Sequence, residues 1–238
     1  MKAMIFAAGL GTRLQPLTNY CPKALVKVNN KTLLEHSIKY LQQFGIYDVI
    51  VNVHHFAPEI IETINDNAGF GSQITISDES AQVLETGGGL KKAAHFFENE
   101  PVFVLTNVDV LTNLDLRKMI DIHLASGAMG TLAVMRRESS RHLLFDENMY
   151  LCGWGNTSSG QLRICRSNKD TQPFAFSGIS VLSYPILNNI LFNGKFSLID
   201  LYLHLAETNN FMGYDHTGNI FIDVGKPENI AKAEYLFS

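Results

Sequence analysis

The sequence has few cysteines, no long apolar run and no excess of positive charge. Its three cysteines, Cys21, Cys152 and Cys165, are odd in number and widely spaced, which excludes a disulfide framework and a Cys-x-x-Cys zinc site. No apolar stretch approaches the length of a membrane span, and the first apolar run is too short for a signal peptide. A formal charge of −4 argues against a nucleic-acid or anionic-membrane partner. We therefore expect a cytoplasmic protein.

The sequence does contain alternating patterns of core-forming residues. With 238 residues, 46% of them hydrophobic, the chain is long enough for one large α/β domain. Short apolar runs typical of buried strands alternate with stretches of helical spacing. Strands are expected at 4–8, 48–53, 74–76, 102–105 and 220–224, and helices at 34–41, 58–65, 90–97, 116–124, 195–207 and 227–236. This alternation predicts a doubly wound, mostly parallel, Rossmann-like sheet.

The second half of the chain has a different pattern. Strand-like runs at 129–135, 162–165 and 176–182 are separated by Gly, Asn and Ser clusters. Such spacing favours antiparallel ribbons, which we expect to lie over one end of the sheet as a small substrate-binding subregion. No linker, repeat or low-complexity tract separates the parts, so the prediction is a single domain of residues 1–238 with halves at 1–128 and 129–238.

The first loop of the chain is its most informative segment. It reads FAAGLGTRLQPLT over residues 6–18 and is followed by Cys21-Pro22-Lys23. A buried strand opening into a glycine-containing loop with two fixed cations, Arg13 and Lys23, suits the phosphates of a nucleoside triphosphate. No Lys-Ser or Lys-Thr pair follows the second glycine, so this is not a Walker A loop. The alternative is a tight strand–helix turn with surface cations.

This loop resembles the signature of the sugar-1-phosphate nucleotidyltransferases, and the resemblance extends from Met1 to about Leu236. It implies a GT-A-like nucleotidyltransferase fold with a nucleotide-binding half (1–128) and a half that binds the sugar and completes the metal site (129–238). It also implies that Arg13 contacts the leaving pyrophosphate and Lys23 the α-phosphate, both as catalytic residues. Nucleotide-binding residues implied in the same way are Ala7, Ala8, Gly9, Gly11, Thr12, Glu85, Thr86, Gly87, Gly88 and Asn107.

The run Leu84-Glu85-Thr86-Gly87-Gly88-Gly89 is expected to be a loop between a strand and a helix. Bare backbone there can read the edge of a flat base, although such a run is as often a flexible connection. It resembles the base-reading loop of the family. Its form is similar to the branch that contains N-acetylmuramate 1-phosphate uridylyltransferases and mannose-1-phosphate guanylyltransferase-like proteins, which favours UTP.

Two aspartates follow predicted strands. Asp109 follows the strand at 102–105, and Asp223 ends the strand at 220–224. A single aspartate at a strand end is more often a helix cap, but two such carboxylates can share one Mg²⁺. The resemblance implies that Asp109 and Asp223 hold this metal, with Mg²⁺ as the cofactor.

Around the two aspartates, three residues depart from the family pattern. Val108 replaces a glycine beside the site, Phe221 replaces a tryptophan, and Lys226 replaces a threonine. A β-branched residue at position 108 disfavours positive φ and adds bulk beside the ligand. Phe221 keeps an aromatic wall. Lys226 is either a phosphate contact or a solvated charge.

For the sugar, Ser177 and Gly178 resemble the family's sugar-contacting strand, although a glycine-marked bulge fits the spacing nearly as well. Arg163, Arg166 and Lys169 precede this strand and are candidates to hold the sugar phosphate; solvated surface charge is the commoner outcome. No histidine has a metal-ligand spacing with carboxylates.

The expected function is Mg²⁺-dependent transfer of a nucleotidyl group from a nucleoside triphosphate, UTP being favoured, to a sugar 1-phosphate. Mannose 1-phosphate with GTP, glucose 1-phosphate, and phosphocholine with CTP remain open as other substrates. A second class is a nucleotide-sugar binding or regulatory protein without turnover, suggested by Val108. A glycosyltransferase fits less well. Neither nucleic acid nor membrane is expected as a partner, and the sequence does not predict the oligomeric state.

Overall fold

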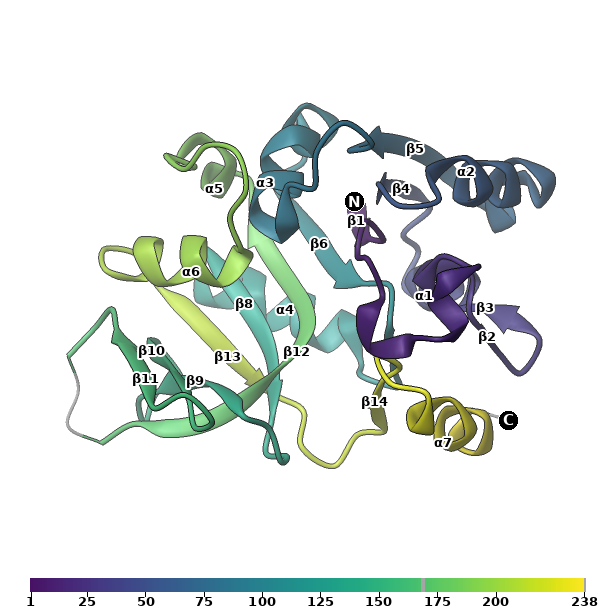
Figure 1. Cartoon of the computed structure of the whole chain (residues 1–238). Coiled ribbons are helices and arrows are strands. Elements are labelled where there is room, and N and C mark those ends of the chain that lie inside the picture. Colours follow the sequence, from purple (N-terminus) through teal and green to yellow (C-terminus); the bar gives the residue numbers. More distant parts are fainter. Residues whose placement is uncertain (168–169, 238) are drawn as a thin grey trace.

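A continuous ten-stranded sheet forms the centre of the computed structural model, which describes residues 1–167 and 170–237 (Figure 1). Its strands are β1 (Lys2–Phe6), β4 (Asp48–Val53), β5 (Gln73–Asp78), β6 (Val102–Asn107), β8 (Gly130–Met135), β9 (Arg141–Phe145), β10 (Leu151–Asn156), β11 (Gln161–Ile164), β12 (Gln172–Ser183) and β13 (Phe211–Asp215). Two small ladders join β2 (Lys27–Val28) to β3 (Lys31–Thr32) and β7 (Val110–Thr112) to β14 (Phe221–Asp223). The α-helices are α1 (Leu33–Gln43), α2 (Ala57–Asp66), α3 (Glu85–Ala93), α4 (Leu116–Ser126), α5 (Pro185–Asn188), α6 (Leu198–Ala206) and α7 (Glu228–Leu236).

The first half forms the parallel part of the sheet, in the order β6-β1-β4-β5. Alternate residues of β1 point to opposite faces: Ala3 and Ile5 join one buried cluster, Met4 and Phe6 the other. Helices α1, α2, α4 and α7 pack in the first cluster, and α3, α5 and α6 in the second. Helices on both faces of a largely parallel sheet confirm the predicted doubly wound α/β class.

The second half continues this sheet instead of lying over its end, which corrects the expected placement of the ribbons. Strand β12 pairs antiparallel with β6 along the edge of the parallel part, and β8 and β9 pair with β12. The long β12 is the reason, because its residues 172–174 pair with β9 while its residues 179–183 pair with β6. Figure 1 shows β9, β10 and β11 at the far side of the molecule from α1 and α2.

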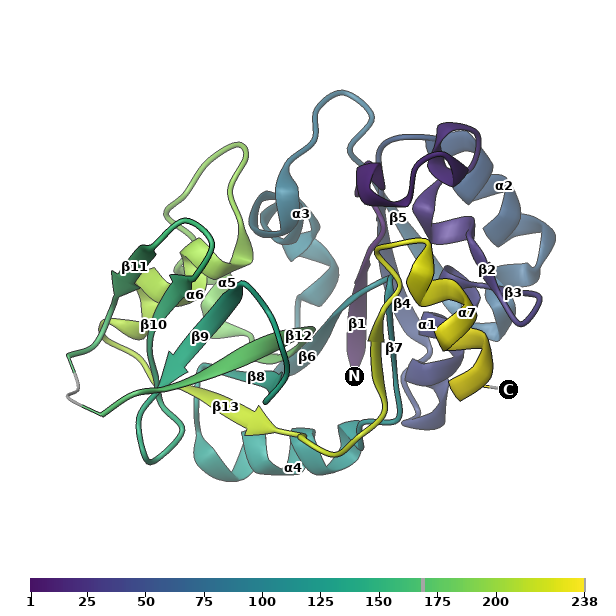
Figure 2. The same cartoon turned by 60° about the horizontal axis from the view of Figure 1, so that its bottom comes forward.

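Several predicted elements match the structure closely. The strand at 48–53 is confirmed, and the helices expected at 34–41, 58–65 and 116–124 lie within α1, α2 and α4. The strand expected at 220–224 is short and leaves the main sheet to pair with β7, which places it beside α7 in Figure 2. Among the described residues, no helix is both long and apolar enough to cross a bilayer.

Candidate active site

The loop after β1 forms one wall of a cavity of about 400 Å³, called here the smaller cavity. Nine of the residues predicted for the site line it: Ala7, Ala8, Gly9, Arg13, Lys23, Glu85, Thr86, Asn107 and Asp109. Gly11 and Thr12 are not on its wall. Gly11 has a positive φ of 66°, and its carbonyl accepts a hydrogen bond from the Thr18 hydroxyl at 2.7 Å. The loop is therefore shaped by Gly11, while residues 7–10 and Arg13 face the cavity.

Asn52, which was not predicted from the sequence, joins two walls of the smaller cavity. Its side-chain oxygen accepts the N–H groups of Ala7 at 2.7 Å and Ala8 at 3.4 Å, and its amide nitrogen donates to Glu79 at 2.8 Å. The other carboxyl oxygen of Glu79 accepts the N–H of Leu84 at 3.2 Å. Asn52 and Glu79 are both buried, with exposed fractions of 2% and 1%. A polar residue at the end of a buried strand was the only sequence signal for this network.

The glycine run is part of helix α3 and not the open loop that was predicted. The N–H groups of Gly87 and Gly88 donate to the carbonyl of Phe196 at 2.9 and 3.2 Å. A Cβ on Gly88 would collide with the carbonyl oxygen of Gly194, so the helix needs a bare backbone for close packing against residues 192–197. This packing overrides the low helix propensity of glycine. Glu85 and Thr86, at the start of α3, face the smaller cavity.

The two predicted metal aspartates lie side by side. Asp109 is in the turn between β6 and β7, Asp223 ends β14, and the ladder of β7 with β14 brings the turns together; the N–H of Val224 donates to the Asp109 carbonyl at 2.8 Å. Lys23 forms an ion pair with Asp109, and Arg13 approaches Asp223 at 3.6 Å. The predicted cations and carboxylates therefore form one cluster.

The two carboxyl groups respond differently to this cluster. Burial raises the pKa of Asp109, but the charge and hydrogen bond of Lys23 oppose it and hold that pKa below its usual value. Burial and the neighbouring Asp109 charge raise the pKa of Asp223. One oxygen of Asp223, Oδ1, is buried without a hydrogen-bond partner.

These features fit a divalent cation, because two facing carboxylates and a buried, unsatisfied oxygen are hard donors that such an ion satisfies. Asp109 and Asp223 are the residues that would hold it. Within residues 1–167 and 170–237, no group of three or more His, Cys, Asp or Glu side chains is placed to bind a metal. The remaining ligands would therefore be water and substrate oxygens, as is usual for Mg²⁺.

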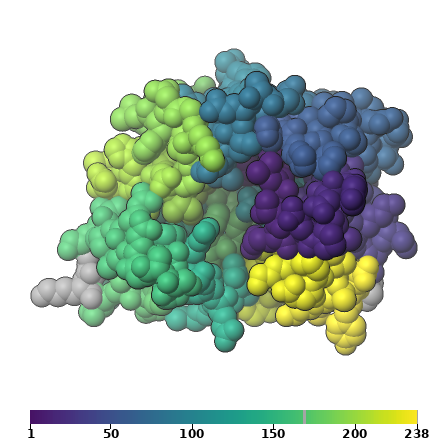
Figure 3. All heavy atoms as spheres, viewed as in Figure 1, coloured from purple at the N-terminus to yellow at the C-terminus, as the bar shows by residue number. Residues whose placement is uncertain are grey.

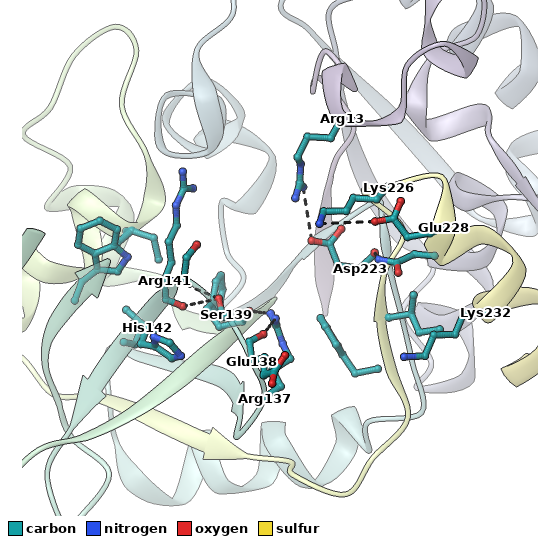
Figure 4. A pocket seen from close by; sticks show the side chains of 18 residues that line it. Arg13, Arg137, Glu138, Ser139, Arg141, His142, Asp223, Lys226, Glu228 and Lys232 are labelled. Atoms are coloured by element: carbon teal, nitrogen blue, oxygen red, sulfur yellow. Dashed lines mark hydrogen bonds and ion pairs between the residues drawn. The ribbon is translucent and has the colours of Figure 1, made fainter. Parts of the chain in front are cut away.

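A second cavity, of about 920 Å³ and called the larger cavity, has Asp223 on its wall (Figure 4). Arg13 lines both cavities, Asp109 lines the smaller one and Asp223 the larger. The larger cavity is walled by segments of the second half and of the C-terminus, including Trp154, Phe176 and Phe221. In Figure 3 the surface is hollowed between the purple N-terminal segment and the green strands of the second half. The aspartate pair thus stands at the border of two adjoining cavities.

Ser177 and Gly178 lie behind these walls. Ser177 is buried, with its hydroxyl 2.7 Å from Nε2 of His216. Gly178 has a positive φ of 74°, and the side chain of Asn107 fills the space where a Cβ would stand. The register of β12 against β8 shifts between Phe176 and Ser180, so the bulge that the glycine suggested is present. Their neighbour Phe176 lines the larger cavity.

The cations named as candidates to hold a sugar phosphate are engaged elsewhere. Arg163 pairs with Asp200, and Arg166 donates to the carbonyls of Ala206 and Asn209 at 3.2 and 3.1 Å. Neither lines the larger cavity, and Lys169 lies outside the described residues. Arg137, Arg141 and Lys232 line it instead. The sequence did not predict these three residues because they belong to no recognised motif.

The residues that depart from the family pattern are accommodated. Val108 is buried in the core without a positive φ, so its β-branch introduces no backbone strain. It also lines the smaller cavity, next to Asp109. Phe221 and Lys226 line the larger cavity, and Lys226 lies 3.8 Å from Glu228.

Comparisons with known proteins agree with this geometry. A family model described as nucleotidyl transferase matches residues 2–145. An N-acetylmuramate alpha-1-phosphate uridylyltransferase of Caulobacter vibrioides is 32% identical over 98% of this chain and 95% of its own length. One from Neisseria meningitidis is 30% identical over 99% and 98%. The crystal structure of HddC from Yersinia pseudotuberculosis complexed with GMP-PN covers 100% of this chain and 99% of its own, with a TM-score of 0.80 and 25% identity.

Proposed function

This chain belongs to the nucleotidyl transferase family, as a sugar-1-phosphate nucleotidyltransferase, and from that premise we propose that it transfers the uridylyl group of UTP to a sugar 1-phosphate with Mg²⁺ as cofactor. Residues 1–128 bind the nucleotide, and residues 129–238 bind the sugar phosphate and complete the metal site within a single domain. The substrates are small cytoplasmic metabolites, so the proposal includes neither a nucleic-acid nor a membrane partner.

The observation that carries the proposal is the border between the two cavities. The smaller cavity presents the loop at residues 7–10 and is lined by Asp109, whereas the larger one is lined by Asp223. Arg13, Lys23, Asp109 and Asp223 stand between them. A reaction that joins two phosphorylated substrates needs such a shared, charged border.

The chemistry requires positioning and neutralisation of charge. An oxygen of the sugar 1-phosphate forms a bond to the α-phosphorus of the nucleotide in line with the bond to the β-phosphate, which breaks and releases pyrophosphate. The attacking phosphate is already ionised at neutral pH, so no general base is needed. Lys23 is placed to balance charge at the α-phosphate and Arg13 at the leaving pyrophosphate, both beside the aspartates. When bound at Asp109 and Asp223, Mg²⁺ would neutralise phosphate charge.

The preference for UTP is supported by two relatives that align over nearly their whole length and are named as uridylyltransferases. Glu85 and Thr86, at the start of α3, provide polar groups on the wall of the smaller cavity for reading a base. GTP is the second candidate, because HddC was solved complexed with GMP-PN.

A matrix of the four nucleoside triphosphates against a panel of sugar 1-phosphates tests the proposal, with pyrophosphate release and NDP-sugar formation as readouts. The panel includes N-acetylmuramate, glucose and mannose 1-phosphates, with phosphocholine as a further acceptor. We expect the highest turnover with UTP, and its loss in EDTA with recovery on adding Mg²⁺. A preference for another triphosphate would overturn the base assignment, and tight NDP-sugar binding without turnover would overturn the proposed enzyme activity.

A further inference from the structure

Arg137 is a cation of the larger cavity that two other segments, β12 and β14, hold in place. It follows β8, and its Nη2 donates to the carbonyl of Phe176 on β12 at 2.9 Å. Its guanidinium carbon lies 4.9 Å from the ring centroid of Phe221 on β14. A planar guanidinium held by a carbonyl and an aromatic ring has few remaining orientations. The side chain is thus preorganised before any ligand arrives.

Among the residues that the structure describes, no carboxylate forms an ion pair with Arg137. The side chain is half-buried, and burial lowers its pKa while the charge of Asp223 opposes that change. Even so, no ion pair joins Arg137 to Asp223, whereas Arg13 approaches the same carboxylate at 3.6 Å. The Nε atom of Arg137 is also buried without a hydrogen-bond partner. A half-buried cation with an unsatisfied N–H group is unfavourable until a hydrogen-bond acceptor reaches it, and an anion would also balance its charge.

The position of Arg137 identifies the anion. Arg13, above Asp223 in Figure 4, also lines the smaller cavity, whereas Arg137, below Asp223, lines only the larger one. Arg163 and Arg166, the candidate phosphate ligands from the sequence, are engaged outside this cavity. A guanidinium fork matches the oxygens of a phosphate more closely than a lysine ammonium does.

We propose that Arg137 binds the phosphate group of the acceptor sugar 1-phosphate and holds it beside Asp223 for attack on the nucleotide. This role rests on the proposed function. Arg13 and Lys23 serve the triphosphate on one side of the aspartate pair, and Arg137 serves the attacking phosphate on the other. The enzyme therefore separates the charges of its two anionic substrates between cations from different halves of the chain.

Two variants of Arg137 and a matched control test this assignment. Arg137→Met removes the charge and the fork, Arg137→Lys keeps the charge, and Arg136→Gln alters the neighbouring arginine. Arg136 also stacks on an aromatic ring, 4.5 Å from the centroid of Phe174, but is exposed and lines neither cavity. Initial rates with the best acceptor of the wild-type matrix give kcat/KM for the acceptor, and calorimetry gives the Kd of UTP.

We expect Arg137→Met to lower kcat/KM for the acceptor by about a hundredfold or more, with the Kd of UTP unchanged within twofold. Arg137→Lys should recover part of the loss, and Arg136→Gln should match the wild type. An unchanged kcat/KM for the acceptor in Arg137→Met would overturn the assignment. A parallel loss of UTP affinity and Tm would also overturn it, because that pattern indicates a structural role.

Failure of the proposed function is distinguishable from failure of this inference. If the wild type turns over no sugar 1-phosphate, the proposed function is wrong whatever the variants do. Inorganic phosphate, titrated by calorimetry into the wild type and Arg137→Met, then tests the assignment directly. Weaker binding by the variant supports a phosphate site at Arg137, and equal binding overturns it.

Discussion

The smaller and larger cavities meet at Asp109 and Asp223, but the chain builds them differently. The smaller cavity is lined by short segments that follow the parallel strands β1, β5 and β6, by Asn52 in β4 and by the start of α3. The larger cavity is assembled from residues 137–143, Trp154, Phe176 and the segment 221–232, which come from antiparallel strands and the C-terminal helix. Binding sites at the ends of parallel strands come from contiguous motifs, whereas sites between antiparallel strands depend on register. This difference sets how each cavity responds to mutation.

The largest effect is expected at the border, where both cavities share charge. Lys23→Ala and Asp109→Asn should each lower kcat by about a hundredfold to a thousandfold, roughly 3–4 kcal/mol in the barrier, because they remove fixed charges beside the reacting phosphates. Pyrophosphate release measures the loss, and circular dichroism with Tm checks folding. If either variant releases pyrophosphate at a near wild-type rate, the border does not carry the chemistry.

The sequence predicted the smaller cavity better than the larger one. The loop with Arg13 and Lys23, and the two aspartates, were found because local motifs follow recognisable buried strands. All four cluster in the structure. Asn52 and Glu79 were missed, since each is an ordinary polar residue at a strand end until the fold places it against Ala7 or Leu84.

The larger cavity was predicted poorly for physical reasons. Strands β9, β10 and β13 were not predicted. Arg163 and Arg166 were named as candidate phosphate ligands, with solvated surface charge as the commoner outcome, and Arg137 was not named. Whether an arginine points into a cavity or to a carbonyl on the far side depends on strand register, and a shift of one residue reverses it. Gly87–Gly89 was predicted as a loop for a similar reason, because the contact with Phe196 that makes it helical comes from a distant segment.

Gly88→Ala tests how tightly the two halves are packed. The added methyl would collide with the Gly194 carbonyl and lie 2.9 Å from the Leu84 Cβ, so overpacking should exceed the gain in helix propensity. We expect a loss of about 3 kcal/mol in unfolding free energy, measured by urea denaturation. Gly155→Ala is the control, because a Cβ there meets its nearest atom at 3.7 Å. Equal stability of the two variants would show that α3 tolerates a side chain at this contact.

Acid should destabilise the protein through His123, a buried histidine that contacts strands β8 and β12. His123 is buried between the hydroxyls of Thr131 on β8 and Ser183 on β12, and burial lowers its pKa to about 4. Between pH 6.5 and 4 the unfolded chain binds a proton that the folded chain does not, so stability present above pH 6.5 is lost as the pH falls. From pH 7 to pH 5 this loss is about 2 kcal/mol.

Urea unfolding of the wild type and His123→Gln at these two pH values measures the contribution of His123. The variant should lose about 2 kcal/mol less than the wild type on going from pH 7 to pH 5. His216, in the second half, has a pKa lowered by burial to about 4 and contributes in the same direction, so some pH dependence remains in the variant. His95→Gln, at an exposed position of the first half, is the control. An identical pH dependence in the wild type and His123→Gln would refute this assignment.

The smallest expected effect distinguishes the two cavities most directly. Asn52→Ala removes the acceptor for the N–H groups of Ala7 and Ala8 and the donor to Glu79, while leaving Arg13, Lys23 and both aspartates in place. Without this bridge, the loop at residues 7–10 and the segment at 79–86 are no longer held at one separation. We expect the KM for UTP to rise about tenfold, or 1.4 kcal/mol, with the KM for the acceptor unchanged within twofold.

Asn67→Ala, at an exposed position on the same half, should change neither constant. Arg137→Met should lower kcat/KM for the acceptor and leave the Kd of UTP unchanged, so the two variants have opposite expected effects. Equal rises in both KM values would show that the cavities share one supporting framework and do not respond separately.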